Sequence, residues 1–340
     1  MTPSVAVLGC GHWGKNLVRN FRDLGALALV CDPDPRGRET ARRLAPGVPV
    51  TADLADVWRS DVKGVVIAAP AEQHGDLALT ALEAGKDVFV EKPLTLRDEE
   101  GARMVDTAAR RGAVLMVGHL LEYHPAVRAA LACVRAGEIG RLRYLTSTRH
   151  SFGQVRRAED VLWSFAPHDL AVCLRFADAL PVEVQAWHSH LLRPDVADQV
   201  SARLTFGGAG YATGTLEARI SVSWLHPVKE QRLLIVGEEG AISFDDVAKT
   251  LTRHPRRVQA KGSTFALHKG EDEAIPFASE EPLRLECEAF LHAVKTRTPP
   301  LTDGASGLRV LRVLTRLGQP RPTQPKVMSS NPRPPLEAAP

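Results

Sequence analysis

The sequence lacks several features that would place the protein in a specialised class. It has no run of 18 consecutive apolar residues, so we expect no membrane-spanning helix. Its five cysteines are odd in number and scattered, and none forms a Cys-x-x-Cys or Cys-x-x-x-His pair. We therefore expect neither a disulfide framework nor a bound metal.

The sequence also has little excess of one sign of charge. The formal net charge is +3 over 340 residues, too small and too dispersed to indicate a nucleic-acid partner. The longest basic cluster, residues 253–257, is interpreted as a solvated loop. No basic segment followed by an apolar stretch precedes the first predicted strand, so we expect no signal peptide and a cytoplasmic location.

The first third of the chain alternates short apolar runs with helical patterns. Strands are predicted over 5–8, 26–31, 64–69, 87–90 and 114–117, and helices over 15–24, over 76–84 and from Thr95 to about 111. Thr95 and Asp98 resemble a capping box for the last of these helices. This alternation predicts an α/β domain over residues 1–120, a Rossmann-like doubly wound parallel sheet.

The pattern changes after Gly118. Strands are predicted over 141–148, 182–190, 199–206, 211–222, 230–236 and 241–244, and helices over 125–136, 167–177, 282–295 and 307–317. Residues 207–210 and 238–240 are interpreted as hairpin turns. We expect an α+β domain over 121–318, with a mostly antiparallel sheet and helices on one face, and a disordered proline-rich tail over 319–340.

A glycine-rich turn follows the first strand directly. Gly9, Gly11 and Gly14 form a Gly-x-Gly-x-x-Gly pattern that opens a helix, and Asp32 ends the next strand. These glycines allow a tight turn, close approach of a pyrophosphate and close helix–strand packing. A carboxylate at Asp32 would bind the adenosine ribose hydroxyls and repel a 2′-phosphate. The pattern predicts NAD as cofactor, with NADP kept as an alternative by the nearby Arg36 and Arg38.

A lysine stands just beyond the carboxyl end of another predicted strand, in Val90-Glu91-Lys92-Pro93. Doubly wound sheets place their chemistry at that edge. Lys92 would therefore donate a hydrogen bond to a substrate oxygen beside the nicotinamide. The alternative is a lysine in a surface turn before proline.

With these motifs, the sequence resembles the Gfo/Idh/MocA oxidoreductases over about residues 3–317. The resemblance rests on residues 7–14, Ala69-Pro70, Glu91-Lys92-Pro93, Val117-Gly118-His119 and the β-rich second half. It implies an open-faced antiparallel sheet, a substrate cleft between the domains, and hydride transfer at a sugar or polyol carbon. It also implies a lysine and a histidine beside the reacting hydroxyl, and a homodimer or homotetramer built through the sheet face.

One stretch departs from the family pattern. The family commonly carries Asp-x-Gly-x-His, whereas this chain has Ser164, Ala166 and His168 at those positions. Asp169 follows at once, but on a helix it points about 100° away from His168. Histidine has an unperturbed pKa near neutrality, so His168 is a candidate base, with Lys92 stabilising the alkoxide; the reverse assignment of roles also stays open. The alternative for His168 is a structural contact at a helix N-terminus.

The resemblance and the residue chemistry together define the candidate sites. Catalytic candidates are Lys92 and His168. The expected cofactor contacts are Gly9, Gly11, His12, Trp13, Gly14, Asp32, Ala69, Pro70, His74, Glu91, Lys92 and His119. The substrate candidates are Lys92, Tyr123, Arg149, Arg156, Arg157 and His168. Tyr123 is alternatively a buried packing residue, and the arginines alternatively belong to a basic surface loop.

Three segments resemble a narrower subgroup of the family, namely residues 118–126, 162–169 and 222–231. They are similar to bacterial enzymes that oxidise the sugar 3-hydroxyl of UDP-N-acetylglucosaminuronic acid in surface-polysaccharide pathways. Two alternatives stay open. One is a dehydrogenase or reductase of a free sugar, inositol or deoxysugar nucleotide. The other is a catalytically silent dinucleotide-binding regulator. His226 and Lys229, in the third segment, receive no chemical assignment.

Overall fold

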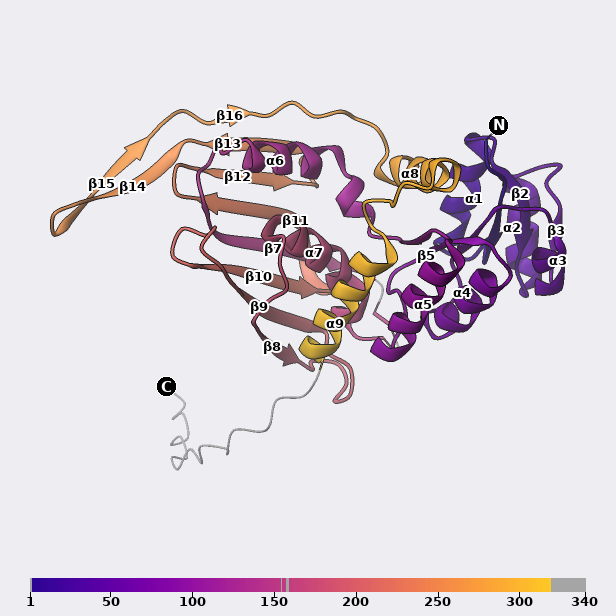
Figure 1. Ribbon diagram of the computed structural model, residues 1–340. Helices are drawn as coiled ribbons and strands as arrows, with labels where there is room; N and C mark the ends of the chain where they lie inside the picture. The colour runs from indigo at the N-terminus through magenta and orange to yellow at the C-terminus, as the bar shows by residue number, and fades with distance from the viewer. Residues whose placement is uncertain (1, 154, 157–158, 319–340) are drawn as a thin grey trace, which may run out of the picture.

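The computed structural model describes residues 2–153, 155–156 and 159–318, which form two large sheets, each with helices packed against it, and one two-stranded sheet (Figure 1). The predicted tail over 319–340 lies outside these residues. Within the described part of the chain, no helix is both long and apolar enough to cross a membrane.

The N-terminal sheet is fully parallel, in the strand order β3-β2-β1-β4-β5-β6. Apart from the half-buried, two-residue β3, its strands are mostly buried apolar runs, as sheets covered on both faces require. The strands are β1 Val5–Leu8, β2 Leu27–Cys31, β3 Val50–Thr51, β4 Gly64–Ile67, β5 Asp87–Val90 and β6 Leu115–Val117. The helices are α1 Gly14–Asp23, α2 Pro35–Leu44, α3 Leu54–Arg59, α4 His74–Glu83 and α5 Asp98–Arg111, with 3-10 turns Ala71–Gln73 and Leu120–Tyr123.

The second sheet has eight strands in the order β16-β13-β12-β11-β7-β10-β9-β8 and is antiparallel except where β10 pairs with β7. Its strands are β7 Leu142–Phe152, β8 Glu183–Ser189, β9 Gln199–Gly207, β10 Thr215–Ser223, β11 Leu225–Gly237, β12 Ala241–Asp245, β13 Thr250–His254 and β16 Glu273–Ala274. The helices are α6 Pro125–Arg135, α7 Val161–Ala177, α8 Pro282–Thr296 and α9 Gly304–Gly318. The predicted fold class is confirmed, and the turns at 207–210 and 238–240 join antiparallel neighbours.

The C-terminal helices connect the two domains. Phe290 of α8 packs against Phe21 and Phe89 in the core of the N-terminal domain. Helix α9 contacts both α5 and α7, so it bridges the two domains. Helix α8 therefore belongs to the core of the N-terminal domain, although the predicted boundary at residue 120 assigns it to the second domain.

Several local predictions are corrected by the structure. Helix α7 begins at Val161 rather than Pro167, because Asp160 caps it by accepting from the Trp163 N–H at 3.0 Å. Thr95 bonds to Glu100 instead of capping α5, whose N-cap position is Arg97.

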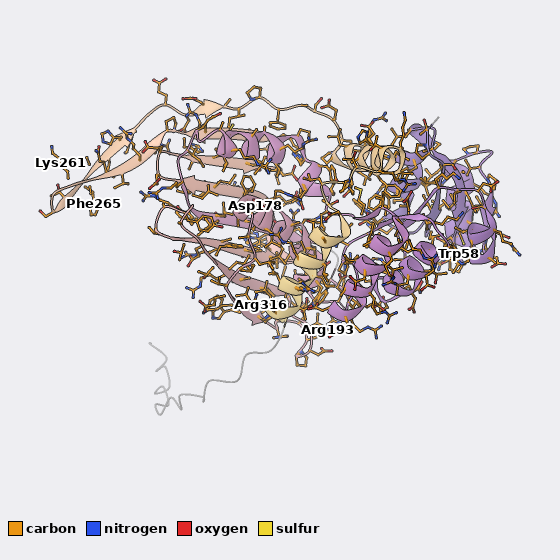
Figure 2. The ribbon with its side chains drawn as sticks, in the orientation of Figure 1. Trp58, Asp178, Arg193, Lys261, Phe265 and Arg316 are labelled. Atoms are coloured by element: carbon orange, nitrogen blue, oxygen red, sulfur yellow. The ribbon has the colours of Figure 1, made fainter. Side chains whose placement is uncertain are left out.

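The basic cluster over 253–257 is not a loop. It spans the end of β13 and the start of β14, and Arg253 pairs with Glu273. Strands β14 Arg256–Lys261 and β15 Thr264–Lys269 form a separate two-stranded arm that projects from the body. Figure 2 shows Lys261 and Phe265 near the tip of this arm.

Candidate active site

The glycine turn adopts the conformation that its sequence predicts. Gly9 has φ +90°, and a Cβ on it would lie 2.7 Å from the Ala68 carbonyl oxygen. A Cβ on Gly14 would lie 2.1 Å from the Gly9 oxygen, so α1 can begin there only with glycine. Gly11 has no neighbour on its open side within 4 Å. This leaves the backbone accessible to a phosphate at the N-terminus of α1.

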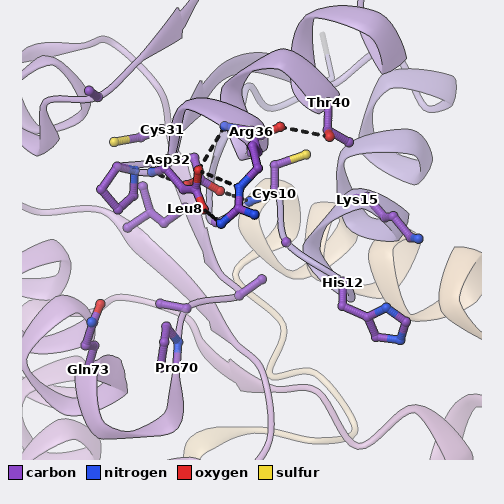
Figure 3. Close-up of a pocket in the computed structure, with 18 of the residues that line it drawn as sticks. Leu8, Cys10, His12, Lys15, Cys31, Asp32, Arg36, Thr40, Pro70 and Gln73 are labelled. Atoms are coloured by element: carbon purple, nitrogen blue, oxygen red, sulfur yellow. Dashed lines mark hydrogen bonds and ion pairs between the residues drawn. The ribbon is translucent and has the colours of Figure 1, made fainter.

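A cavity of about 630 Å³ opens beside this turn (Figure 3). It lies at the carboxyl ends of β1, β2 and β4, where doubly wound sheets bind nucleotides. Six of the predicted cofactor contacts line it, namely Gly9, Gly11, His12, Asp32, Ala69 and Pro70. The volume is in the range of small-molecule sites.

Asp32 supports the turn as well as facing the cavity. Its carboxylate accepts hydrogen bonds from the backbone N–H of Cys10 at 2.6 Å and of Asp34 at 2.8 Å. Each oxygen keeps a further lone pair for a ribose hydroxyl. Arg38 is occupied by the Asp32 and Pro33 carbonyls, and Arg36 pairs with Asp34. The two carboxylates at this end of the cavity favour NAD over NADP.

Glu91 joins the glycine turn to the turn after β5. The Trp13 indole Nε1 donates to Glu91 Oε1 at 2.6 Å. Burial raises the pKa of Glu91 to about 7. Gly118 lies so close that a Cβ on it would be 2.9 Å from Glu91 Oε2. Glu91 therefore fixes three cleft segments relative to one another.

His74, which we predicted to contact the cofactor, has a structural role instead. Its ring is buried, with Nδ1 2.7 Å from the Pro93 carbonyl oxygen and Nε2 2.9 Å from the Ala69 carbonyl oxygen. Neither nitrogen is left for a dinucleotide. His74 holds together the loops that follow β4 and β5.

Lys92 reaches from the N-terminal domain to α7 of the second domain. Its ammonium Nζ donates to the Ser164 carbonyl oxygen at 2.7 Å. Burial lowers the pKa of Lys92, while nearby Glu159 and Glu91 oppose that shift. Lys92 is therefore a partly buried cation at the domain junction and not a lysine in a free surface turn.

His168 lies one helical turn after Ser164, so both residues share a face of α7. Its ring centroid is 6.4 Å from that of His119, with the rings nearly perpendicular. Burial, followed by the charges of Lys92 and Arg149, holds the pKa of His168 well below its usual range. His119 is also buried, with a pKa lowered to about 3 and no partner for either ring nitrogen among the described residues. Two neutral imidazoles and one lysine therefore meet here.

Asp169 does not replace the aspartate that the family pattern carries. It accepts hydrogen bonds from Ser147 at 2.6 Å and from Arg149 at 2.8 Å, beneath α7. The Ser164 hydroxyl is buried and has no partner within the described structure. The backbone carbonyl of Ser164 thus supplies the contact to Lys92.

The substrate candidates are only partly brought together. Tyr123 is buried, and its hydroxyl lies 3.2 Å from Thr302 Oγ1, so it is a packing residue. Arg149 is committed to Asp169 and is not a free cation. Arg156 is exposed and pairs with Glu159 at 3.1 Å. Arg157 lies outside the described residues.

Sequence reasoning missed an ion pair that joins the 3-10 turn Leu120–Tyr123 to α7. Glu122, next to Tyr123, accepts from Arg175 of α7 at 2.5 Å, and burial raises the pKa of Glu122 to about 7. Arg175 also donates to the Leu301 carbonyl at 2.6 Å. The partners are 53 residues apart, and no local pattern signals them.

Known proteins share this architecture along most of the chain. Residues 4–119 match the oxidoreductase family with an NAD-binding Rossmann fold, and residues 127–243 match the Gfo/Idh/MocA C-terminal domain. UDP-N-acetylglucosamine 3-dehydrogenase of Acidithiobacillus ferrooxidans is 30% identical over 90% of this chain and 93% of its own. Its solved structure has a TM-score of 0.80 at 28% identity, covering 92% of this chain and 96% of that one.

Two other relatives extend the comparison. scyllo-Inositol 2-dehydrogenase (NAD+) of Bacillus subtilis is 28% identical over 88% of each chain. The WlbA dehydrogenase from Bordetella pertussis, solved with NADH and UDP-GlcNAcA, has a TM-score of 0.75 at 21% identity and shares the fold over 93% of this chain and 95% of that one. Both domain matches and the cofactor cavity agree with this relationship. The chain therefore belongs to the Gfo/Idh/MocA family and is an NAD-binding dehydrogenase that acts on CH–OH groups.

Proposed function

We propose that the protein transfers hydride from a secondary hydroxyl of a sugar nucleotide to NAD, with Lys92 and His168 beside the reacting carbon. The main support for this proposal is a hydrogen bond. Lys92, at the end of β5, donates it to the turn of α7 that precedes His168. A cation and a neutral imidazole thus meet at the domain junction.

In this mechanism His168 is the base. An imidazole whose pKa is held below its ordinary value is unprotonated at neutral pH and can accept the hydroxyl proton. NAD bound at the glycine turn would accept the hydride from the same carbon, whose C–O bond would become a carbonyl. The Lys92 ammonium stabilises the negative charge that develops on the oxygen. We expect the cofactor to contact the residues predicted from the sequence, except His74.

The proposed substrate is a UDP-N-acetylhexosaminuronic acid, oxidised at its 3-hydroxyl, as in surface-polysaccharide biosynthesis. The 30% identity to a UDP-N-acetylglucosamine 3-dehydrogenase supports the sugar nucleotide and the position. Arg156 supports a carboxylate on the substrate, because it is exposed and its charge contributes to the lowering of the Lys92 pKa. Arg156 would then leave its ion pair with Glu159 and pair with the carboxylate of the substrate.

A second candidate is a dehydrogenase of a free cyclic polyol. The similarity to scyllo-inositol 2-dehydrogenase over 88% of the chain favours it. Such a substrate needs no site for a pyrophosphate. A silent regulatory role is disfavoured, because a sensor has no chemical need for Lys92 beside His168.

One assay distinguishes these functions. Purified protein is incubated with NAD and, separately, UDP-N-acetylglucosamine, its uronic acid, scyllo-inositol and myo-inositol, while absorbance of reduced nicotinamide is followed. We expect the highest kcat/KM with the uronic acid, and Arg156→Met to reduce that preference. A preference for inositols would select the second candidate. Tight NAD binding without turnover of any substrate would contradict dehydrogenase function.

We also propose a homodimer or homotetramer through the face of the eight-stranded sheet that carries no helices. Trp187 and Tyr144 are exposed aromatic residues on this sheet, at 50% and 42% of their surface. Light scattering coupled to size-exclusion chromatography would measure the mass, and a monomer at micromolar concentration would contradict this assembly.

A further inference from the structure

The pairing of β7 with β11 contains an irregularity where β7 ends and β11 begins. Leu225 pairs with Phe152, and the next pair is Glu230 with His150. Four residues of β11, 226–229, therefore stand opposite the single residue Ser151. Such a bulge re-aims the side chains of the strand that contains it. It brings two histidines and a carboxylate together.

The three side chains are His150, His226 and Glu230. Each can present one ligand atom, and these atoms all lie within 4.8 Å of one another. His150 Nδ1 is 3.4 Å from Glu230 Oε2, and the two imidazole centroids are 4.6 Å apart. His150 Nδ1 is buried and has no hydrogen-bond partner among the described residues. His150 Nδ1 thus faces a carboxylate and a second imidazole.

The other nitrogen of each histidine is already engaged. His226 Nδ1 lies 2.7 Å from the Val228 carbonyl oxygen, which can only accept, so Nδ1 carries the proton and Nε2 keeps its lone pair. His150 Nε2 lies 2.9 Å from Ser221 Oγ, which can accept from it and leave Nδ1 unprotonated. Metal-binding histidines are usually oriented by such contacts through their second nitrogen.

We propose that His150, His226 and Glu230 bind a divalent transition-metal ion of the Zn²⁺ type. Two imidazoles and a carboxylate are a common ligand set for zinc, with water as the fourth ligand. Mg²⁺ and Ca²⁺ are disfavoured because they prefer oxygen ligands. Bonds of about 2.0–2.1 Å in a tetrahedron place ligand atoms about 3.3–3.5 Å apart, a separation that His150 and Glu230 already have. The other ligand-atom separations are at most 4.8 Å, so a bound ion would draw His226 closer to His150 and Glu230.

This site is separate from the catalytic residues. Arg149, the neighbour of His150 in β7, points toward Asp169 of α7. Successive side chains of a strand point to opposite faces, so His150 lies on the face away from α7 and His168. A bound ion would join β7 to the bulge of β11 and hold this register. The ligands come from positions 150, 226 and 230, a spacing that matches no sequence motif for zinc.

The test is a titration of the full-length protein with ZnCl2 after treatment with a chelator and removal of the chelator. Calorimetry is expected to show one equivalent bound in the micromolar range. Co²⁺ should give the d–d absorption of a four- or five-coordinate ion. His226→Gln and Glu230→Gln should each weaken binding by at least about tenfold. The matched control is His268→Gln, which removes a histidine of the projecting arm and should leave the affinity unchanged.

Circular dichroism and NAD binding verify that each variant is folded. Zn²⁺ should also raise the melting temperature of the wild type but not that of His226→Gln. Absence of binding to the wild type would overturn the proposal. Equal affinity of the wild type and a folded His226→Gln variant would overturn it too, because the ion would then bind elsewhere.

Discussion

Arg149 gives a prediction that separates a structural role from a substrate-binding role. Its guanidinium pairs with Asp169 at 2.8 Å, and the two side chains are only 14% and 2% exposed. Asp169 directly follows the proposed base, His168. Arg149→Met removes the cation but keeps much of the apolar volume. We expect this change to destabilise the C-terminal domain, because it leaves a buried carboxylate without its partner.

The expected size follows from that burial. Removing one member of a buried ion pair typically destabilises a protein by about 3–5 kcal/mol. For a domain of this size each kcal/mol lowers the melting temperature by about 2–4 °C. Arg149→Met should therefore melt about 6–20 °C below the wild type. Ser147 still donates to Asp169, which favours the lower half of this interval.

The assay is thermal unfolding followed by circular dichroism, with steady-state kinetics on the folded enzyme. Arg141→Met is the matched control, because Arg141 precedes the same strand and pairs with Glu238 at a surface where Arg141 is 56% exposed. Exposed pairs contribute about 1 kcal/mol or less, so the control should melt within about 4 °C of the wild type. Arg149→Met/Asp169→Asn removes the buried charge as well and should recover most of the loss.

A different outcome would refute this reasoning. If Arg149→Met has the melting temperature of the wild type and raises only the KM for the sugar nucleotide, Arg149 binds the substrate directly. If the double variant melts as low as the single one, the unpaired carboxylate is not the cause.

The catalytic cleft gives four further predictions. His168→Asn and Lys92→Met should each lower turnover at least about 100-fold with an unchanged Kd for NAD measured by calorimetry; normal turnover removes that residue from the mechanism. The pH profile of kcat/KM, measured by steady-state kinetics, should have two limbs. Activity should rise as His168 loses its proton, at a pKa below 6.5, and fall as Lys92 loses its charge, at a pKa below 10.5. Ser164→Asp should raise the pKa of Lys92 and move the alkaline limb to higher pH; an unmoved limb would place the carboxylate away from Lys92. Asp32→Asn should lower the ratio of NAD to NADP specificity by about tenfold, measured as kcat/KM with each cofactor, whereas an unchanged ratio would contradict charge repulsion.

Local patterns predicted most of the architecture because their physics is local. Alternating buried strands and helices predicted the parallel sheet, and the glycine spacing predicted the turn at Gly9. The start of α7 was missed because proline favours the first turn of a helix, whereas Pro167 is the seventh residue of α7. The two-residue β3 and the exposed arm of β14 and β15 lack the apolar runs that indicate strands.

The sequence by itself determined the dinucleotide turn, the carboxylate at Asp32 and the presence of Lys92 and His168. Only the tertiary structure decided what those groups meet. It set Lys92 against the Ser164 carbonyl, tied Arg149 to Asp169, buried Tyr123 against Thr302 and gathered His150 with His226. Spacing along a chain fixes turns and helix faces, whereas burial and long-range pairing depend on how distant elements pack. The residue types were therefore predictable, and their partners were not.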